Sequence, residues 1–220
     1  MSCTKTGMST SFLFSGPDNA PVTILLAHGA GGPMDSAGME RFSVALATAG
    51  MRVVRFEFAY MAERRLSDRR PPPPKAETLI PEYLAAVREL GASGPLVIGG
   101  KSMGGRIASM VADDLHRAGD IAGLLCLGYP FHPMGKPTQL RTAHLGTLKT
   151  PTLICQGTRD PFGTREEVAD YSLSPDIDIF WLEDGDHDLK PRKAISGFSA
   201  ADHMAAMASR VGAWAAGLLR

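Results

Sequence analysis

The sequence predicts an α/β fold, namely a doubly wound, mostly parallel sheet of about six to seven strands with helices on both faces. Three observations support this prediction. Short apolar runs alternate with longer amphipathic stretches along the chain. The inner runs are apolar at consecutive positions, as a sheet covered on both faces requires. Glycine directly follows two of the amphipathic stretches, which is typical of the end of a helix.

The apolar runs give the expected strands in chain order. They are residues 22–27, 52–58, 96–99, 121–127, 152–156 and 178–182, and residues 12–14 could add an antiparallel edge strand. The amphipathic stretches give the expected helices, which are residues 39–49, 77–90, 103–118, 165–171 and 200–219. We therefore expect residues 1–220 to form a single domain, with residues 1–20 as an N-terminal extension or edge strand.

Composition excludes several classes of protein. The 220 residues contain 23 Lys plus Arg and 23 Asp plus Glu, so there is no overall basic bias, and we expect no nucleic-acid partner. No run approaches the roughly 20 apolar residues of a membrane-spanning helix, and the N-terminus lacks the apolar core of a signal peptide. Cys3, Cys126 and Cys155 form no CxxC pair and predict free thiols, which fits a cytoplasmic location.

The stretch VIGGKSMGGR, residues 97–106, admits two interpretations. Gly-Lys-Ser could end a phosphate-binding loop of the form G-x-x-x-x-G-K-[ST]. That loop needs a glycine five positions before Gly100, where this chain has Pro95. The apolar strand also occupies the positions that should curl around phosphate. Nucleotide binding is therefore disfavoured.

The same residues fit a nucleophile elbow, G-x-S-x-G, in which a strand turns sharply into a helix. Gly100 and Gly104 stand two positions before and after Ser102, where larger side chains would clash. The turn would expose the Ser102 hydroxyl above the end of the strand. We expect the backbone N–H of Met103 to be one donor of an oxyanion hole.

A serine hydroxyl needs a general base, and in such folds an acid and then a histidine follow it along the chain. Asp160 follows the strand at 152–156 and is the candidate acid, although a turn or helix-capping aspartate is the alternative. His187 follows the strand at 178–182 and is the candidate base. Asp186 and Asp188 flank it and are expected to shape its loop or tune its field.

The glycine-rich loop after the first parallel strand is expected to supply the second oxyanion donor. The N–H of Ala30 is favoured, with that of Gly31 next. His28 is expected to be a neutral structural histidine, and together with Tyr129 and His132 it is a candidate for lining a substrate cleft. The histidines show no metal-ligand spacing. Nucleophilic attack by an activated serine needs neither a metal nor a cofactor, so we expect none.

With these residues assembled, the chain resembles the α/β-hydrolase superfamily, and more closely the small, lidless, dienelactone-hydrolase-like bacterial proteins. The resemblance is carried by GKSMGGR, GYPFHPMGKP, QGTRDPFG and GDHDLK and runs from about residue 22 to the C-terminus. It implies triad roles for Ser102, Asp160 and His187. The branch also includes a eukaryotic scaffold subunit of a histone acetyltransferase complex. Dienelactone hydrolases proper use a cysteine nucleophile, whereas this chain has serine.

About twenty residues, 131–150, separate the strand at 121–127 from the next, which leaves no room for a cap domain. An open cleft of this kind suits small or exposed esters and thioesters, so we expect a serine hydrolase of the carboxylesterase or thioesterase type. A non-catalytic binding or scaffold protein on the same fold is the alternative. Residues 63–75, rich in arginine and proline, predict an extended surface loop that could attract an anionic substrate or partner.

Overall fold

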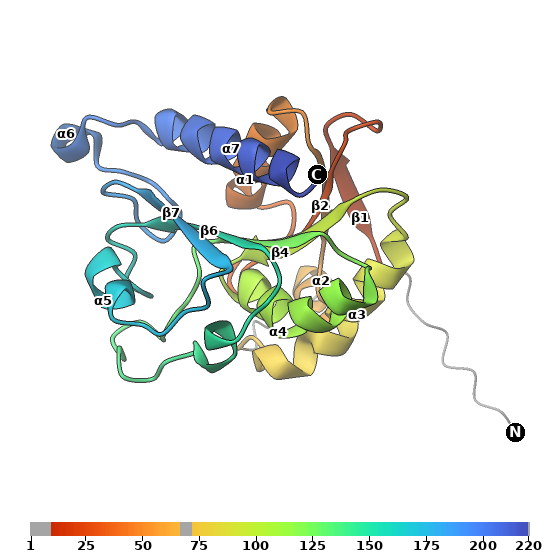
Figure 1. Ribbon diagram of the computed structural model, residues 1–220, viewed down its shortest axis with the longest axis horizontal. Coiled ribbons are helices and arrows are strands. Elements are labelled where there is room, and N and C mark those ends of the chain that lie inside the picture. The colour runs from red at the N-terminus through yellow and green to blue at the C-terminus, as the bar shows by residue number, and fades with distance from the viewer. Residues whose placement is uncertain (1–9, 67–71, 220) are drawn as a thin grey trace, which may run out of the picture.

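The computed structural model describes residues 10–66 and 72–219. Seven strands form one sheet in the order β1-β3-β2-β4-β5-β6-β7, and every neighbouring pair is parallel except β1 with β3 (Figure 1). The strands are β1 Phe12–Ser15, β2 Thr23–Ala27, β3 Arg52–Phe56, β4 Leu96–Lys101, β5 Gly123–Leu127, β6 Thr152–Gly157 and β7 Ile177–Leu182. The predicted fold class and the predicted antiparallel edge strand are therefore confirmed.

Helices cover both faces of the sheet. The helical segments are α1 Ala37–Thr48, α2 Ala59–Leu66, η1 Ala76–Leu79, α3 Ile80–Leu90, α4 Met103–Ala118, η2 Ala143–Gly146, α5 Arg165–Ala169, α6 Lys193–Ser196 and α7 Ala200–Gly217. In Figure 1, α1 and α7 lie together on one face, and α3 and α4 lie on the other. Each face has its own buried cluster, centred on Phe42 and Val211 in one and on Tyr83 and Ile107 in the other.

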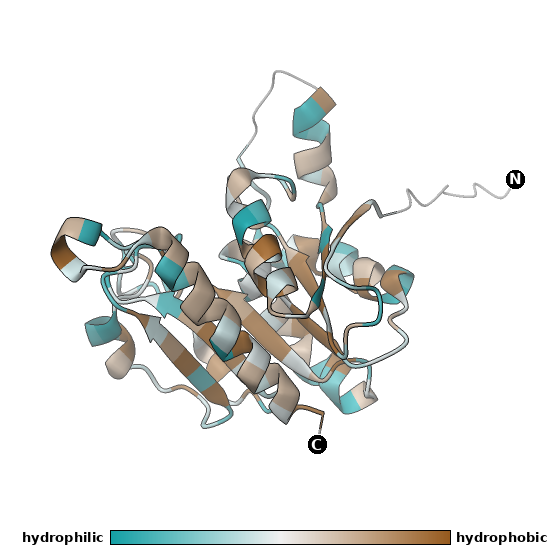
Figure 2. Cartoon of the chain, turned by 90° about the horizontal axis from the view of Figure 1, so that it is seen from above, coloured by the Kyte–Doolittle hydropathy of each residue, from teal (hydrophilic) through white to brown (hydrophobic). Residues whose placement is uncertain are grey.

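The strands are apolar because both faces are covered. All residues of β4, β5 and β6 are buried, and Figure 2 shows the strands mostly in the hydrophobic colour. Parallel strands buried on both faces read as continuous apolar runs rather than as alternating ones. This is why their positions could be predicted from the sequence to within two residues.

The predicted extended loop at residues 63–75 needs correction at its start. Residues 63–66 belong to α2, a helix that the sequence reading missed. Tyr60 and Met61 are buried on this helix, and the Arg65 guanidinium binds the carboxylates of Glu57 and Asp35. These tertiary contacts stabilise a short helix whose own sequence is strongly charged. Residues 67–71, which include the first of the four consecutive prolines, lie outside the described residues.

The sheet order reverses beside β2, because the chain goes from β2 outward to β3 and then returns to the other side as β4. In open α/β sheets, ligands bind at the carboxyl ends of the strands at such a reversal. The loop after β2 and the turn after β4 meet there. The connection from β5 to β6, all of which is described, contains only the short turn η2 and therefore holds no cap domain, as expected. None of the described helices is long and apolar enough to span a membrane.

Candidate active site

Ser102 lies at a sharp turn between β4 and α4. Its backbone has φ 51° and ψ −115°, a conformation that non-glycine residues rarely adopt. The two flanking glycines permit the turn, since a Cβ on either Gly100 or Gly104 would lie 2.5 Å from the Ala27 carbonyl oxygen. Because β4 and α4 pack this closely against β2, the surrounding structure holds the backbone of Ser102 in its strained conformation. Strained backbone held this firmly is characteristic of functional sites.

The helix α4 begins at Met103, directly after this turn. The first N–H groups of a helix have no carbonyl one turn before them, and they carry the positive end of the helix dipole. No side chain caps this end, because Ser102 makes no capping hydrogen bond. The Ser102 side chain thus stands beside a set of backbone donors suited to negative charge on an oxygen.

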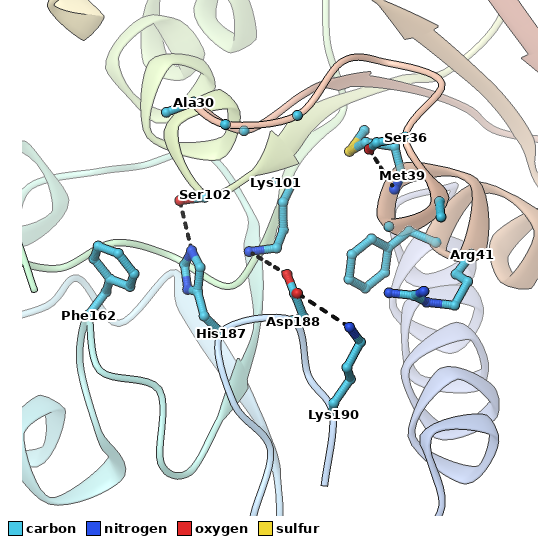
Figure 3. A pocket seen from close by; sticks show the side chains of 16 residues that line it. Ala30, Ser36, Met39, Arg41, Lys101, Ser102, Phe162, His187, Asp188 and Lys190 are labelled. Carbon is cyan, nitrogen blue, oxygen red and sulfur yellow. Dashed lines mark hydrogen bonds and ion pairs between the residues drawn. The ribbon is translucent and has the colours of Figure 1, made fainter. Parts of the chain in front are cut away.

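Three polar side chains from three strand ends form a continuous hydrogen-bonded chain. His187 Nε2 lies 2.8 Å from Ser102 Oγ, and His187 Nδ1 lies 2.7 Å from Asp160 Oδ2. Figure 3 shows the Ser102–His187 contact at the edge of a pocket. The structure therefore brings together Ser102, Asp160 and His187. Ser102 is 85 residues from His187 along the chain, and Asp160 is 27 residues from it.

Asp160 is fully buried, and its two carboxylate oxygens are held by different donors. Oδ1 accepts from the Phe162 N–H at 2.9 Å, and Oδ2 accepts from Gln156 Nε2 at 2.9 Å as well as facing His187. Gln156 Oε1 in turn accepts from the Tyr129 N–H at 2.7 Å. The sequence reading missed this role of Gln156, although a glutamine in an otherwise apolar strand was a usable signal.

The loop that carries His187 is fixed by internal polar contacts. Asp186 Oδ1 accepts from the N–H groups of Asp188 and Lys190, both at 2.9 Å, which agrees with the expected loop-shaping role of Asp186. Arg159 binds the carbonyls of Asp184 and Lys190. Hydrogen bonds from Arg192 lower the pKa of Asp184 to about 2. The imidazole ring also packs on Phe162, with ring centroids 4.3 Å apart.

A pocket of about 520 Å³ opens in front of Ser102. Its wall consists of the glycine-rich loop 29–32, the start of α1, Lys101, Phe162 and the loop 187–190 (Figure 3). Ala30 and Gly31 thus lie at the pocket with Ser102, as the expected oxyanion loop requires. The Ala30 carbonyl accepts from the Tyr60 hydroxyl at 3.2 Å, and the Gly29 carbonyl contacts the His28 ring at 2.7 Å.

These two contacts orient the loop. In a trans peptide, the N–H points opposite to the C=O of the same unit. The carbonyls of Gly29 and Ala30 face His28 and Tyr60. The N–H groups of Ala30 and Gly31 therefore point away from these two side chains.

The expected cleft residues His28, Tyr129 and His132 do not line this pocket, and this part of the prediction was wrong. All three side chains are buried, because they hold neighbouring segments together. His28 contacts the Gly29 carbonyl and accepts from the Phe58 N–H at 3.2 Å, and burial lowers its pKa, so it is the neutral structural histidine expected. The Tyr129 hydroxyl contacts Ser109 and His144, and His132 contacts Glu167.

The pocket residues that were not anticipated include Arg41, Lys101, Lys190 and Phe162. Lys101 is the most unusual of them, because its side chain is buried at the end of β4. Desolvation lowers its pKa to about 8, and Asp188, 3.6 Å from Nζ, opposes that shift. The sequence places this lysine directly before the elbow serine. It was considered there only as part of the phosphate-binding loop that was rejected.

Comparison with known proteins agrees with the fold described above. A family model described as an alpha/beta hydrolase domain matches residues 20–216. A dienelactone hydrolase from Anabaena variabilis superposes with a TM-score of 0.69 at 19% identity, over 95% of this chain and 92% of that one. The esterase domain of a Rhodothermus marinus protein gives 0.64 at 19% identity, over 94% and 98% of the two chains.

A third similar structure is an α/β serine hydrolase without a lid from Xanthomonas campestris. It gives a TM-score of 0.58 at 18% identity and covers 82% of this chain and 81% of its own. At these identities the structural neighbours establish the fold, and the family match extends over nearly all of the chain. The protein therefore belongs to the α/β-hydrolase family.

Proposed function

We propose that this protein is a serine hydrolase that cleaves small or exposed carboxylic esters or thioesters through an acyl-enzyme. One observation carries the proposal, namely the unbroken hydrogen-bonded chain from Ser102 through His187 to Asp160, with contacts of 2.8 and 2.7 Å. It begins at a serine in strained elbow geometry and ends at a buried carboxylate. Each group thereby has the neighbour that its role requires.

In the first step, Ser102 Oγ attacks the substrate carbonyl carbon while His187 Nε2 takes the hydroxyl proton. Asp160 holds the ring so that Nε2 is the acceptor, and it stabilises the imidazolium that forms. The developing oxyanion is bound by the Met103 N–H and by an N–H of the glycine-rich loop, that of Ala30 or Gly31. Each such donor contributes roughly 10²–10³ in rate in comparable enzymes.

The carbon–oxygen or carbon–sulfur bond of the substrate then breaks, and the leaving group takes the proton from His187 Nε2. A water molecule next attacks the acyl-enzyme, giving its proton to the same nitrogen. The carboxylic acid leaves, and the Ser102 hydroxyl is restored. The uncapped pocket of about 520 Å³ is large enough for a small acyl or alcohol group.

A fluorophosphonate probe tests the proposal, because it reacts covalently with an activated serine hydroxyl. We expect wild type to be labelled and to hydrolyse 4-nitrophenyl acetate, and Ser102→Ala to do neither while remaining folded by circular dichroism. Ser109→Ala is the matched control. Ser109 Oγ also lies 2.8 Å from a histidine, His144 Nε2, but it is buried inside α4 and away from the pocket.

Labelling that survives in Ser102→Ala, or that disappears in Ser109→Ala, would contradict the assignment of the nucleophile. Folded wild-type protein that resists the probe and turns over no ester would instead favour a binding protein on a hydrolase fold.

A further inference from the structure

One wall of the active-site pocket carries an excess of positive charge. Lys101 comes from the end of β4, Arg41 from α1, and Lys190 from the loop after β7, so three separate elements contribute cations to one cavity. Asp188 is the single carboxylate among the pocket-lining residues of the described chain. Figure 3 shows Lys101, Asp188, Lys190 and Arg41 together on the side of His187 opposite to Phe162.

Asp188 only loosely neutralises this wall. It is shared between two ammonium groups, with Lys101 Nζ 3.6 Å from Oδ1 and Lys190 Nζ 3.6 Å from Oδ2. Both separations exceed the roughly 2.7–2.9 Å of a charge-assisted hydrogen bond. Arg41 takes part in no ion pair within the part of the chain that the structure describes. The wall therefore retains unused hydrogen-bond donors and a net positive charge.

The position of Lys101 links this wall to the reaction centre. Only 8% of the residue is exposed, yet it lines the pocket directly before Ser102 in the chain. A Cβ built on Gly128 would lie 3.2 Å from Lys101 Nζ and 3.3 Å from His187 Nδ1, so the ammonium and the imidazole are close neighbours. Burying an ammonium is costly unless it is well paired. Asp188, 3.6 Å from Nζ, lies beyond the length of a good charge-assisted hydrogen bond, and Asp160 and Asp186 attract the ammonium only through space.

We propose that Lys101, Arg41 and Lys190 form a subsite for a carboxylate carried by the substrate. The substrate class is then an ester or thioester whose acyl or alcohol part bears a negative charge a few atoms from the scissile carbonyl. This inference rests on the proposed hydrolase function and specifies its substrate. A carboxylate placed there completes the hydrogen bonding of Lys101 and offsets the excess positive charge.

The cavity favours a small acid over a large polyanion. Its volume of about 520 Å³ is within the range of small-molecule sites, and the buried member of the subsite lies at its inner end, beside His187. A charged group must therefore come within a short chain length of the reacting carbonyl to reach Lys101. Arg41 and Lys190 are more exposed than Lys101 and act from the outer part of the wall.

Two matched pairs of substrates test the subsite on each side of the scissile bond. For the acyl side, 4-nitrophenyl hydrogen adipate is compared with its methyl-capped form. For the alcohol side, 4-acetoxybenzoate is compared with methyl 4-acetoxybenzoate. Rates with Ser102→Ala are subtracted as the uncatalysed background. We expect kcat/KM to favour the carboxylate form at least tenfold in one pair, and 0.5 M NaCl to reduce that preference.

Variants of the three cationic residues then show which side chains cause the preference for the carboxylate substrate. Arg41→Gln and Lys190→Gln should each reduce the ratio of anionic to neutral kcat/KM several-fold, mainly through KM, and Lys101→Met should reduce it most. Arg88→Gln is the control, because Arg88 lines a different hollow, between α3 and the turn after α4, and its loss should leave the ratio unchanged. As a second readout, adipate should slow fluorophosphonate labelling of wild type more than of Lys101→Met.

The outcomes separate the two proposals. Turnover of neutral esters with no preference for the carboxylate in either pair, and no protection by adipate, would overturn the subsite while leaving the hydrolase intact. A preference that persists in all three variants would also overturn it. Absence of labelling in folded wild type would remove the hydrolase and the subsite together.

Discussion

Replacing Lys101 by methionine should stabilise the protein at neutral pH. Methionine has a similar length and no charge, so it can occupy the same buried space at the end of β4. The pKa of Lys101 falls from its ordinary value of 10.5 to about 8 in the folded chain, even with the attraction of Asp188 included. Such a lowering corresponds to roughly 3 kcal/mol of unfavourable free energy for the charged form in the folded state.

The pH dependence follows from the direction of this shift. Because the unfolded chain keeps its proton on Lys101 more readily, the penalty is fully present below pH 8 and disappears as the pH rises toward 10.5. Lys101→Met should therefore unfold at higher urea concentration than wild type at pH 7. The difference in the free energy of unfolding should shrink steadily between pH 8 and pH 10.

Urea titrations followed by circular dichroism at pH 6.5, 8 and 9.5 measure this difference. Lys149→Met is the control, because it removes the same charge from an exposed position and should change stability by no more than about 0.5 kcal/mol. A Lys101→Met variant that is less stable than wild type at pH 7 would refute the reasoning. A gain that stays constant across this pH range would equally refute it, since it would then come from packing and not from charge.

Three further predictions concern Asp160, the proposed carboxylate of the triad, the elbow at Ser102 and the strand β4 that leads into the elbow. Asp160→Asn should lower kcat on the order of 10⁴-fold with little change in KM, since the carboxylate orients the histidine; steady-state kinetics measure this, and a loss under tenfold would exclude the role. Gly104→Ala should prevent stable folding, because the added Cβ would lie 2.5 Å from a backbone carbonyl, whereas Gly212→Ala, whose nearest atom lies 4.0 Å away, should raise the thermal midpoint slightly. Equal melting temperatures for the two alanine variants would contradict this reading. Tyr83→Phe should cost about 1–3 kcal/mol in urea unfolding, because its buried hydroxyl bonds both the N–H and the C=O of Gly99, at 2.9 and 2.8 Å; an unchanged midpoint would count against it.

The elbow and the strand ends could be predicted because each depends on a short stretch of the sequence. The elbow at Ser102 was predictable because strand, turn and helix follow one another within ten residues, and the glycine spacing is imposed by local sterics. Asp160 and His187 could be predicted to lie near Ser102 because each follows a strand, and the carboxyl ends of parallel strands meet at one edge of a sheet. Helix α2 was missed because its stability comes from contacts with distant carboxylates such as Asp35.

By itself, the sequence determined the sheet, the two layers of helices and the three strand ends at which polar residues gather, because these follow from hydrophobic periodicity and local turn chemistry. Only the tertiary structure decided which side chains face the pocket. It buried His28, Tyr129 and His132 and brought Arg41, Lys101 and Lys190 to one wall. The direction in which a polar side chain points depends on which distant segment offers it a partner, and that choice is made only when the elements pack.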